Sequence, residues 1–268
     1  MRKLARIALL LLLGTVLVLS NRVPLYASSF TTDPFTWSGM SIEGERDDYN
    51  PSGSAEFRYD EMMMLLEIVL TNDTSQQTLA IGEVLTGLTF DLTGFTGTLV
   101  PYEALINTGS GLVGVGATSA TDLSSEWGFR DDLSAGEGVG SFAVSAVGDV
   151  NFGADSFGPK DRFDQSKNLF GPPSGSLGGI DAGIVGPNVS LGSDGFSNQG
   201  PVVQNQMTFS FWVLGEGLSE DSISNVQPFF GSDGAFLVQV PEPSTLLLLG
   251  TCLVGLAGIQ RKRFSKRS

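Results

Sequence analysis

The 268-residue sequence contains no histidine and one cysteine, Cys252. Without histidine, neither a Ser-His-Asp triad nor a Cys-His pair can be built. With one cysteine an intrachain disulfide is impossible. Because this cysteine lies in an apolar stretch near the end, a His- or Cys-ligated zinc site elsewhere in the chain is excluded as well. We expect Cys252 to be a small apolar packing residue, with acylation or a covalent role in processing as the alternative. Carboxylate chemistry remains, since a glycosidase needs only two Asp or Glu side chains about 5–10 Å apart.

Basic residues are scarce outside the two ends of the chain. Only six of the 15 Lys and Arg residues lie between Ser28 and Val240, against 28 of the 29 acidic residues, so this segment has a formal net charge of −22. A surface this acidic repels nucleic acid and anionic membrane. We therefore expect no nucleic-acid partner, and good solubility with an affinity for cations.

Residues 1–27 predict a secretory signal peptide. Arg2, Lys3 and Arg6 form a basic start, residues 7–19 are apolar, and Ala27 offers a small residue for cleavage. We predict recognition by the export machinery and cleavage after Ala27. The alternative is an uncleaved N-terminal anchor.

Residues 28–239 are rich in Gly, Ser, Thr, Asp and Asn, and short apolar runs alternate with turn residues. This spacing predicts a mainly β fold: one acidic, antiparallel, jelly-roll-like β-sandwich with long Gly/Asp-rich loops. The expected strands are 35–42, 55–59, 62–70, 84–92, 96–102, 127–129, 141–147, 207–214, 226–230 and 235–240.

Two details of this prediction are specific. The run 96–102 is expected to pair with 84–92 across a turn at Thr93 and Gly94, and the run 62–70 is expected to be a buried strand. Residues 149–200, with many Gly and Pro, are expected to form long loops at one end of the sandwich and not a second domain.

No cofactor is predicted, with calcium as the one candidate. Asp149, Asn151 and Asp155 place oxygen ligands at alternating positions, but Gly153, Ala154 and Lys160 stand where an EF-hand loop needs other residues. An irregular calcium site could use Asp149, Asn151 and Asp155, with Asp161 or Asp164 from the next loop. The alternative is a soluble loop held by Asx-turns.

Neighbouring residues in a strand point to opposite faces, so adjacent carboxylates are expected at solvated edges or turns. This applies to three pairs: Asp47 with Asp48, Asp60 with Glu61, and Asp131 with Asp132. We expect the three tryptophans, Trp37, Trp127 and Trp212, to pack in the core, with Trp212 half-exposed or in a second core layer. An exposed aromatic strip, or two carboxylates facing one cleft, would instead favour a carbohydrate-binding module or a carboxylate-based carbohydrate-active enzyme.

The chain ends with three parts in a fixed order. The first is the polar motif Val240, Pro241, Glu242, Pro243 and Ser244, where the two prolines favour an extended backbone. The second is an apolar segment containing Leu246, Leu247, Leu248, Leu249, Val254, Leu256 and Ile259, and the third is a basic stop-transfer cluster with Arg261, Lys262 and Arg263. The 16 residues 244–259 would span about 24 Å as a helix, slightly short of a bilayer core of about 30 Å. We predict a transmembrane helix with the basic cluster on the cytoplasmic side.

This order of motif, apolar run and Arg-rich end, over residues 240–268, resembles the PEP-CTERM sorting signal. The resemblance implies a bacterial protein that is exported and then processed by a membrane enzyme, an exosortase. It would be held transiently in the inner membrane and end at the cell surface or outside the cell. We expect a non-enzymatic surface or extracellular-matrix protein, associated with biofilm or exopolysaccharide. A plain C-terminal membrane anchor is the alternative interpretation of the tail.

Overall fold

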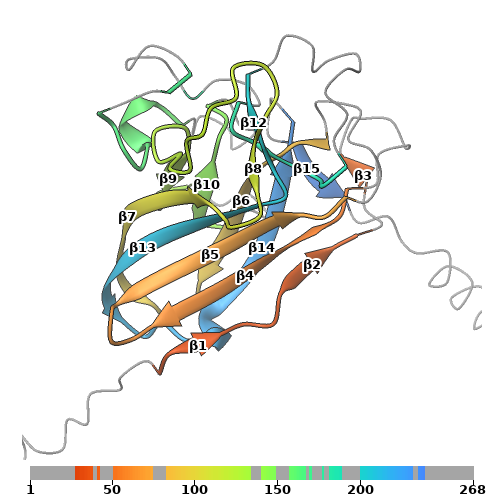
Figure 1. Ribbon diagram of the computed structural model, residues 1–268. Coiled ribbons are helices and arrows are strands. Elements are labelled where there is room, and N and C mark those ends of the chain that lie inside the picture. Colours follow the sequence, from red (N-terminus) through yellow and green to blue (C-terminus); the bar gives the residue numbers. More distant parts are fainter. Residues whose placement is uncertain are drawn as a thin grey trace, which may run out of the picture.

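Two β-sheets stack face to face in the computed structural model (Figure 1). The structure describes residues 28–38, 41–42, 51–74, 83–133, 140–148, 157–166, 169–170, 177, 181–188, 200–231 and 235–238. The short 3-10 helices η2 (Pro159–Asp161) and η3 (Glu220–Ser222) lie between strands. Within the described residues no helix has the length and apolar character needed to cross a membrane. The mainly β, sandwich-like prediction is confirmed, and jelly-roll connectivity stays a prediction.

The first sheet has six strands in the order β1-β4-β5-β13-β7, with β2 also paired to β4. Its members are β1 (Phe30–Thr31), β2 (Phe35–Trp37), β4 (Gly53–Asp60), β5 (Leu65–Asn72), β7 (Thr96–Ile106) and β13 (Gln206–Glu216). All its pairs are antiparallel. Strand β7 is therefore an edge strand.

The second sheet has nine strands in the order β3-β15-β14-β6-β11-β12-β8, and β10 pairs with both β6 and β9. Its members are β3 (Ser41–Ile42), β6 (Leu85–Leu92), β8 (Gly111–Val113), β9 (Gly128–Arg130), β10 (Phe142–Ser145), β11 (Ile184–Val185), β12 (Val202–Gln204), β14 (Ile223–Phe230) and β15 (Ala235–Val238). The pair β11–β12 is parallel, so the prediction of a wholly antiparallel sandwich is wrong at this place.

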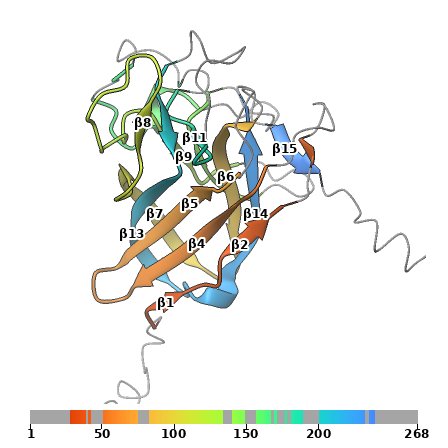
Figure 2. The same ribbon diagram turned by 45° about the vertical axis from the view of Figure 1, so that its right-hand side comes forward.

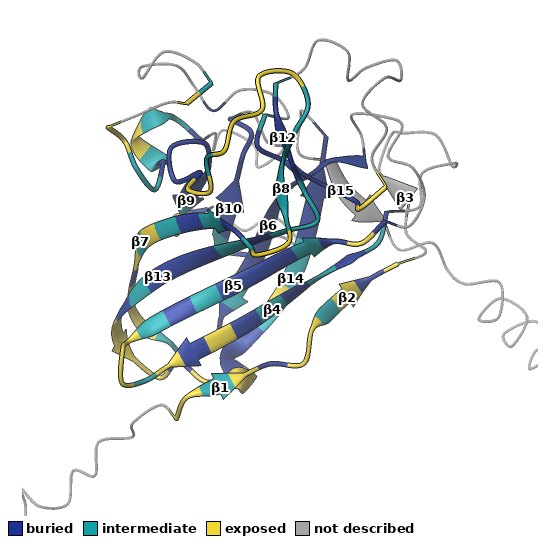
Figure 3. Cartoon of the chain, viewed as in Figure 1, coloured by how far each residue is buried: buried dark blue, intermediate teal, exposed yellow. Residues whose placement is uncertain are grey.

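The core between the sheets follows the period-two pattern of the sequence. In β13 the alternate residues Met207, Phe209, Phe211 and Val213 are buried (Figure 3). Aromatic rings join the two sheets, as in the edge-to-face pair of Phe57 in β4 and Phe90 in β6 with centroids 5.3 Å apart. Burial of these side chains is the main stabilising contribution to the fold.

A second, smaller apolar cluster contains Leu133, Ala143, Val147, Phe157, Leu177 and Phe229. Phe157 and Leu177 belong to the Gly-rich region 149–200, which was predicted to form loops at one end of the sandwich. These two residues instead pack on strands β10 and β14 of the nine-stranded sheet. Phe229 of this cluster covers Gly87 in β6, since a Cβ added at Gly87 would lie 1.9 Å from its ring. This contact contributes to the burial of β6 at nearly every position and not only at alternate ones.

Two strand predictions are corrected. Met62, Met63 and Met64 are exposed in the turn that joins β4 to β5, and β5 begins only at Leu65. The turn is closed because the Met64 amide donates to the carbonyl of Glu61 at 3.2 Å and the Met63 amide donates to the Asp60 carboxylate at 3.0 Å. Strands β6 and β7 follow each other across Thr93 and Gly94 but do not pair: β6 joins β14, β10 and β11, whereas β7 joins β13 in the other sheet. The short connection is an arch between sheets and not a hairpin.

Candidate functional site

A polar groove lies beside the edge strand β7. It has a volume of about 500 Å³ and is lined by Tyr102, Glu103, Asp122, Ser124, Phe163, Asp164 and Gln165. A second hollow of about 300 Å³, with Ser119, Ala120, Thr121, Ser125 and Leu169 in its wall, shares Asp122 and Asp164 with the first. The two hollows therefore adjoin at these two residues, and together they are called the groove below.

Backbone hydrogen bonds hold one wall of the groove against β7. The amide of Ile106 donates to the carbonyl of Thr121 at 2.8 Å, and the amide of Leu123 donates to the carbonyl of Ala104 at 2.8 Å. The amide of Ala104 also donates to the Ser124 hydroxyl at 2.9 Å. This pairing covers the last residues of β7 and leaves the earlier ones at the open edge.

The carboxylate of Asp122 is oriented by its own turn. Its Oδ1 accepts hydrogen bonds from the Ser124 amide at 3.0 Å and from the Ser124 hydroxyl at 2.6 Å. The opposite wall is held by a backbone hydrogen bond, in which the amide of Asp164 donates to the carbonyl of Ser124 at 2.8 Å. Both carboxylates thus belong to well-defined loops.

Glu103 is the distinctive acid of the groove. No hydrogen bond or ion pair of its carboxylate is found within the described part of the chain. Partial burial raises the pKa of Glu103, and the negative charges of Asp122 and then Glu67 raise it further. No Lys or Arg lines either hollow, so the groove favours ligands that donate hydrogen bonds or carry positive charge.

An aromatic pair adjoins the groove. The register of β7 and β13 shifts so that Ser210 faces Glu103 and Phe211 faces Pro101, which leaves Tyr102 as the extra residue of a β-bulge. The Tyr102 ring, 49% exposed, lies 5.0 Å from the ring of Trp212 at an interplanar angle of 51°. Trp212 is half-buried, as one of its two predicted alternatives stated, whereas Trp37 and Trp127 are confirmed as core residues.

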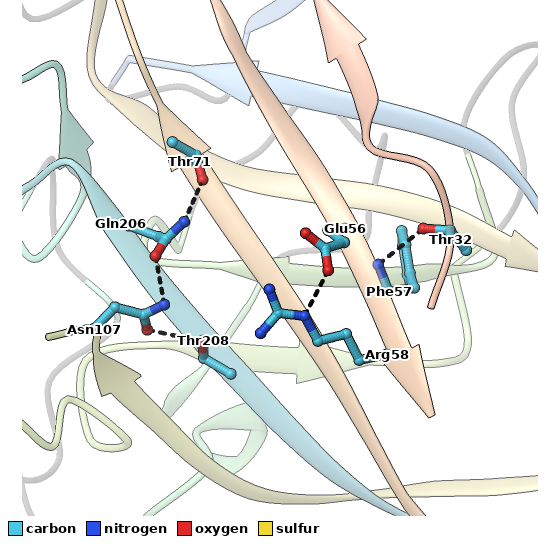
Figure 4. Close-up of polar contacts among 8 residues, drawn as sticks. All are labelled: Thr32, Glu56, Phe57, Arg58, Thr71, Asn107, Gln206 and Thr208. Atoms are coloured by element: carbon cyan, nitrogen blue, oxygen red, sulfur yellow. Dashed lines mark hydrogen bonds and ion pairs between the residues drawn. The ribbon is translucent and has the colours of Figure 1, made fainter. Parts of the chain in front are cut away.

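A chain of polar side chains continues along the outer face of the six-stranded sheet (Figure 4). Gln206 donates to the Thr71 hydroxyl at 2.8 Å, Asn107 donates to Gln206 at 2.6 Å, and Thr208 donates to Asn107 at 2.7 Å. On the same face, Arg58 pairs with Glu56 at 2.6 Å. The one basic side chain of this face that the structure describes is thus already engaged by a carboxylate.

The other carboxylates singled out in the sequence behave as turn residues where they are described. Asp60 accepts from the Met63 amide at 3.0 Å, and Asp132 pairs with Arg130 at 2.7 Å on the surface. Asp161 accepts from the Gly158 amide at 2.7 Å, and Asp164 accepts from the Ser166 amide at 2.9 Å. Asp47 and Asp48 lie outside the described residues.

The calcium candidates Asp149, Asn151 and Asp155 also lie outside the described residues. Among the residues that are described, no group of three or more Asp, Glu, His or Cys side chains has a geometry that could hold a metal ion. Calcium binding by the loop with Asp149, Asn151 and Asp155 therefore stays an untested alternative.

The chain leaves the sandwich through β15, which ends at Val238. Two views place β15 and the turn at residues 61–64 at opposite ends of the sandwich (Figures 1 and 2). Everything after Val238, including the motif, the apolar segment and the basic cluster, lies outside the described residues.

The family model described as the PEP-CTERM protein-sorting motif matches residues 239–262. The chain carries a PEP-CTERM sorting motif. The comparison with curated proteins and the comparison with solved structures found no match. The motif implies an exported protein that is targeted to an exosortase and sorted through the membrane.

The PEP-CTERM match begins one residue after β15 and covers the predicted motif 240–244, the apolar segment 244–259 and the first two basic residues, Arg261 and Lys262. It confirms the resemblance drawn from the sequence. The roles predicted for single residues of the motif, and the boundaries at 27 and 240, stay predictions.

The sequence did not reveal the groove. Tyr102 is only the last residue of the expected strand 96–102, and no sequence pattern marks Glu103, Asp122 or Ser124. A local signal does exist, since Pro101 in a strand marks an edge or a bulge. The walls of the groove come from residues more than 60 positions apart, so only the fold brings them together.

Proposed function

We propose that the protein is a non-enzymatic surface or extracellular-matrix protein, processed by an exosortase-like membrane enzyme through its C-terminal segment. The match of residues 239–262 to the PEP-CTERM sorting motif carries this proposal. The predicted route is export by the signal peptide 1–27, transient anchoring in the inner membrane through 244–259, and release to the cell surface or the medium.

The fold is compatible with release of an intact domain. Val238 ends the last strand, and the matched segment starts at the next residue. Processing within residues 240–244 would therefore leave all the strands of both sheets on the released side. An extended Pro-Glu-Pro backbone just outside the membrane is also the form that an enzyme can bind along its cleft.

The processing step is tested by Glu242→Ala and Pro243→Ala in a host with an exosortase. Immunoblots of membrane and medium should show unprocessed precursor held in the membrane. Glu220→Ala, which removes an exposed carboxylate about 20 residues before the motif in the sequence, is the matched control and should be processed normally. Normal release of both motif variants would mean that the segment is an ordinary linker before a plain membrane anchor.

The non-enzymatic assignment is supported by the chain's lack of histidine and by the use of Asp60, Asp161 and Asp164 as hydrogen-bond acceptors in turns. Glu103 is the residue on which a glycosidase would depend, since its raised pKa suits a general acid. We expect no new reducing ends when the protein is incubated with polysaccharides. Turnover that disappears in Glu103→Gln would replace the proposal with a carboxylate glycosidase.

A further inference from the structure

Exposed apolar side chains gather at one corner of the six-stranded sheet. Of the eight large apolar residues that are exposed within the described ranges, six lie here: Met62, Met63, Met64, Val100, Tyr102 and Leu214. In the sheet register Trp212 stands between Leu65 on β5 and Val100 on β7, and Leu214 follows beside Thr98. A contiguous exposed apolar area of this kind marks an interaction site in soluble proteins.

This corner is held by specific hydrogen bonds. The amide of Val213 donates to the carbonyl of Met64 at 2.8 Å, which fixes the methionine turn against β13. The amide of Met63 donates to the Asp60 carboxylate at 3.0 Å. Met64 also adopts a left-handed backbone with φ of 49°, which a methionine does not favour. The exposed side chains are therefore displayed by an ordered surface.

The apolar corner passes directly into the polar groove. Along β7, Val100 beside Trp212 is followed by Tyr102 and then by Glu103, whose groove continues to Asp122, Asp164 and Gln165. The resulting strip has an apolar, aromatic part at Val100, Trp212 and Tyr102, and a polar part at Glu103 and Asp122 that accepts hydrogen bonds. Its ligand must therefore present flat apolar faces and many hydrogen-bond donors in one extended chain.

Charge excludes several occupants. The carboxylates of Glu67, Glu103 and Asp122 repel anionic membranes and anionic polymers. A second copy of the chain is disfavoured for the same reason, since residues 28–240 have a formal net charge of −22. The corner also lies at the opposite end of the sandwich from β15, which leads to the membrane segment (Figures 1 and 2).

We propose that the strip from Val100 and Trp212 through Tyr102 to Glu103 and Asp122 binds an uncharged polysaccharide chain. The C–H faces of sugar rings pack on the aromatic rings of Tyr102 and Trp212. The sugar hydroxyls donate to the carboxylates of Glu103 and Asp122, and hydrogen bonds to charged acceptors are the stronger ones. The inference rests on the proposed surface role, which would bring the strip into contact with extracellular polymers.

Trp212 provides a direct optical test. Trp37 is 4% and Trp127 is 0% exposed, so the ring of Trp212 is the accessible one of the three. The purified full chain in detergent would be titrated with uncharged glucan and galactomannan oligosaccharides, with alginate as an anionic glycan and with oligolysine as a cationic peptide. An uncharged oligosaccharide should change the tryptophan emission and protect it from acrylamide quenching.

Calorimetry on variants assigns the site. Trp212→Ala and Tyr102→Ala should each weaken binding of the uncharged oligosaccharide by about tenfold or more, the order expected when one stacking partner is lost. Trp212→Phe keeps an aromatic ring and should bind more tightly than Trp212→Ala. Val115→Ser removes an exposed apolar residue elsewhere and should bind as the parent does. Melting curves establish that each variant is folded.

The proposal is overturned if no uncharged oligosaccharide binds, if only alginate or oligolysine binds, or if Trp212→Ala binds as tightly as the parent. These outcomes are independent of sorting, because the purified chain needs no exosortase. If the binding test fails, the proposal of processing by an exosortase is unaffected. If the Glu242→Ala and Pro243→Ala variants are released normally, the binding test remains valid.

Discussion

Asn72 is a buried polar link between the two sheets, and replacing it with aspartate should be strongly destabilising. Its side chain is fully buried at the end of β5. The Nδ2 group donates to the carbonyls of Glu83 at 3.1 Å and Ile184 at 2.9 Å, and Ile184 belongs to β11 of the other sheet. The Oδ1 atom accepts from the amide and the hydroxyl of Thr74 at 3.2 and 2.6 Å.

In Asn72→Asp at neutral pH, a carboxylate oxygen faces the two carbonyl oxygens in place of the amide donor. Each buried carbonyl left without a donor costs about 1–3 kcal/mol, so the two together cost about 2–6 kcal/mol. This is a large part of a typical unfolding free energy of about 5–15 kcal/mol. Burial of the new charge adds to the cost.

The effect should depend on pH. Burial and the facing carbonyls raise the folded-state pKa of the introduced carboxyl above its unfolded value of about 3.9. The variant is therefore least impaired at low pH, and it loses stability as the pH rises through that folded-state pKa. The neutral acid at low pH can also donate to one of the two carbonyls.

Urea unfolding followed by tryptophan fluorescence at pH 5 and pH 7.5 would measure both effects. The matched control is Asn107→Asp, because half-buried Asn107 loses one donated bond to Gln206 but still accepts from Thr208 (Figure 4). We expect it to cost about 1 kcal/mol with little dependence on pH. Equal losses in the two variants, or a loss in Asn72→Asp that ignores pH, would refute the role assigned to Asn72.

Three further predictions concern Asp91, Gly87 and calcium. Partial burial alone would raise the pKa of Asp91, but two hydrogen bonds from Ser141 and one from Asn225 together hold the pKa below its ordinary value. Its stabilising effect is present above the unfolded pKa of about 3.9 and is lost as the pH falls through the lower folded value. In scanning calorimetry Asp91→Asn should therefore lower the melting temperature more at pH 7 than at pH 3, and equal shifts would contradict this. Gly87→Ala would place a Cβ 1.9 Å from the Phe229 ring and should cost about 3 kcal/mol, whereas Gly111→Ala, with open space around the Cβ, should cost under about 1 kcal/mol in urea unfolding. Millimolar calcium should leave the melting temperature unchanged, and a clear rise would indicate that the Asp149, Asn151 and Asp155 loop binds the ion.

The alternation of apolar residues predicted where the strands lie better than it predicted which strands pair with each other. The alternation in β4 and β13 reports which side chains face the core, and this depends only on neighbours in sequence. The partner of β7 depends on residues about 110 positions away in β13. A three-residue connection, Thr93 to Phe95, can form either a hairpin or an arch between sheets, so the sequence could not distinguish the two.

The sorting motif and the proposed binding strip also differ in how far they can be predicted from neighbouring residues in the sequence. The sorting motif is local, with its three parts in order over residues 240–268, so it could be recognised without a structure. The strip at Tyr102, Trp212 and Glu103 depends on a bulge in β7 and on loops that return from residues 121–124 and 163–165. Pro101 is a local signal of the bulge, but the loop contacts leave no local pattern in the sequence.

The most direct test of the account is the intact mass of the mature protein from a host with a functional exosortase. The account predicts a chain that starts at Ser28 and ends within or next to the motif 240–244, and a longer, membrane-held form when the exosortase is deleted. A mature mass that still includes Leu246 to Ser268, unchanged by the deletion, would contradict processing through the PEP-CTERM motif.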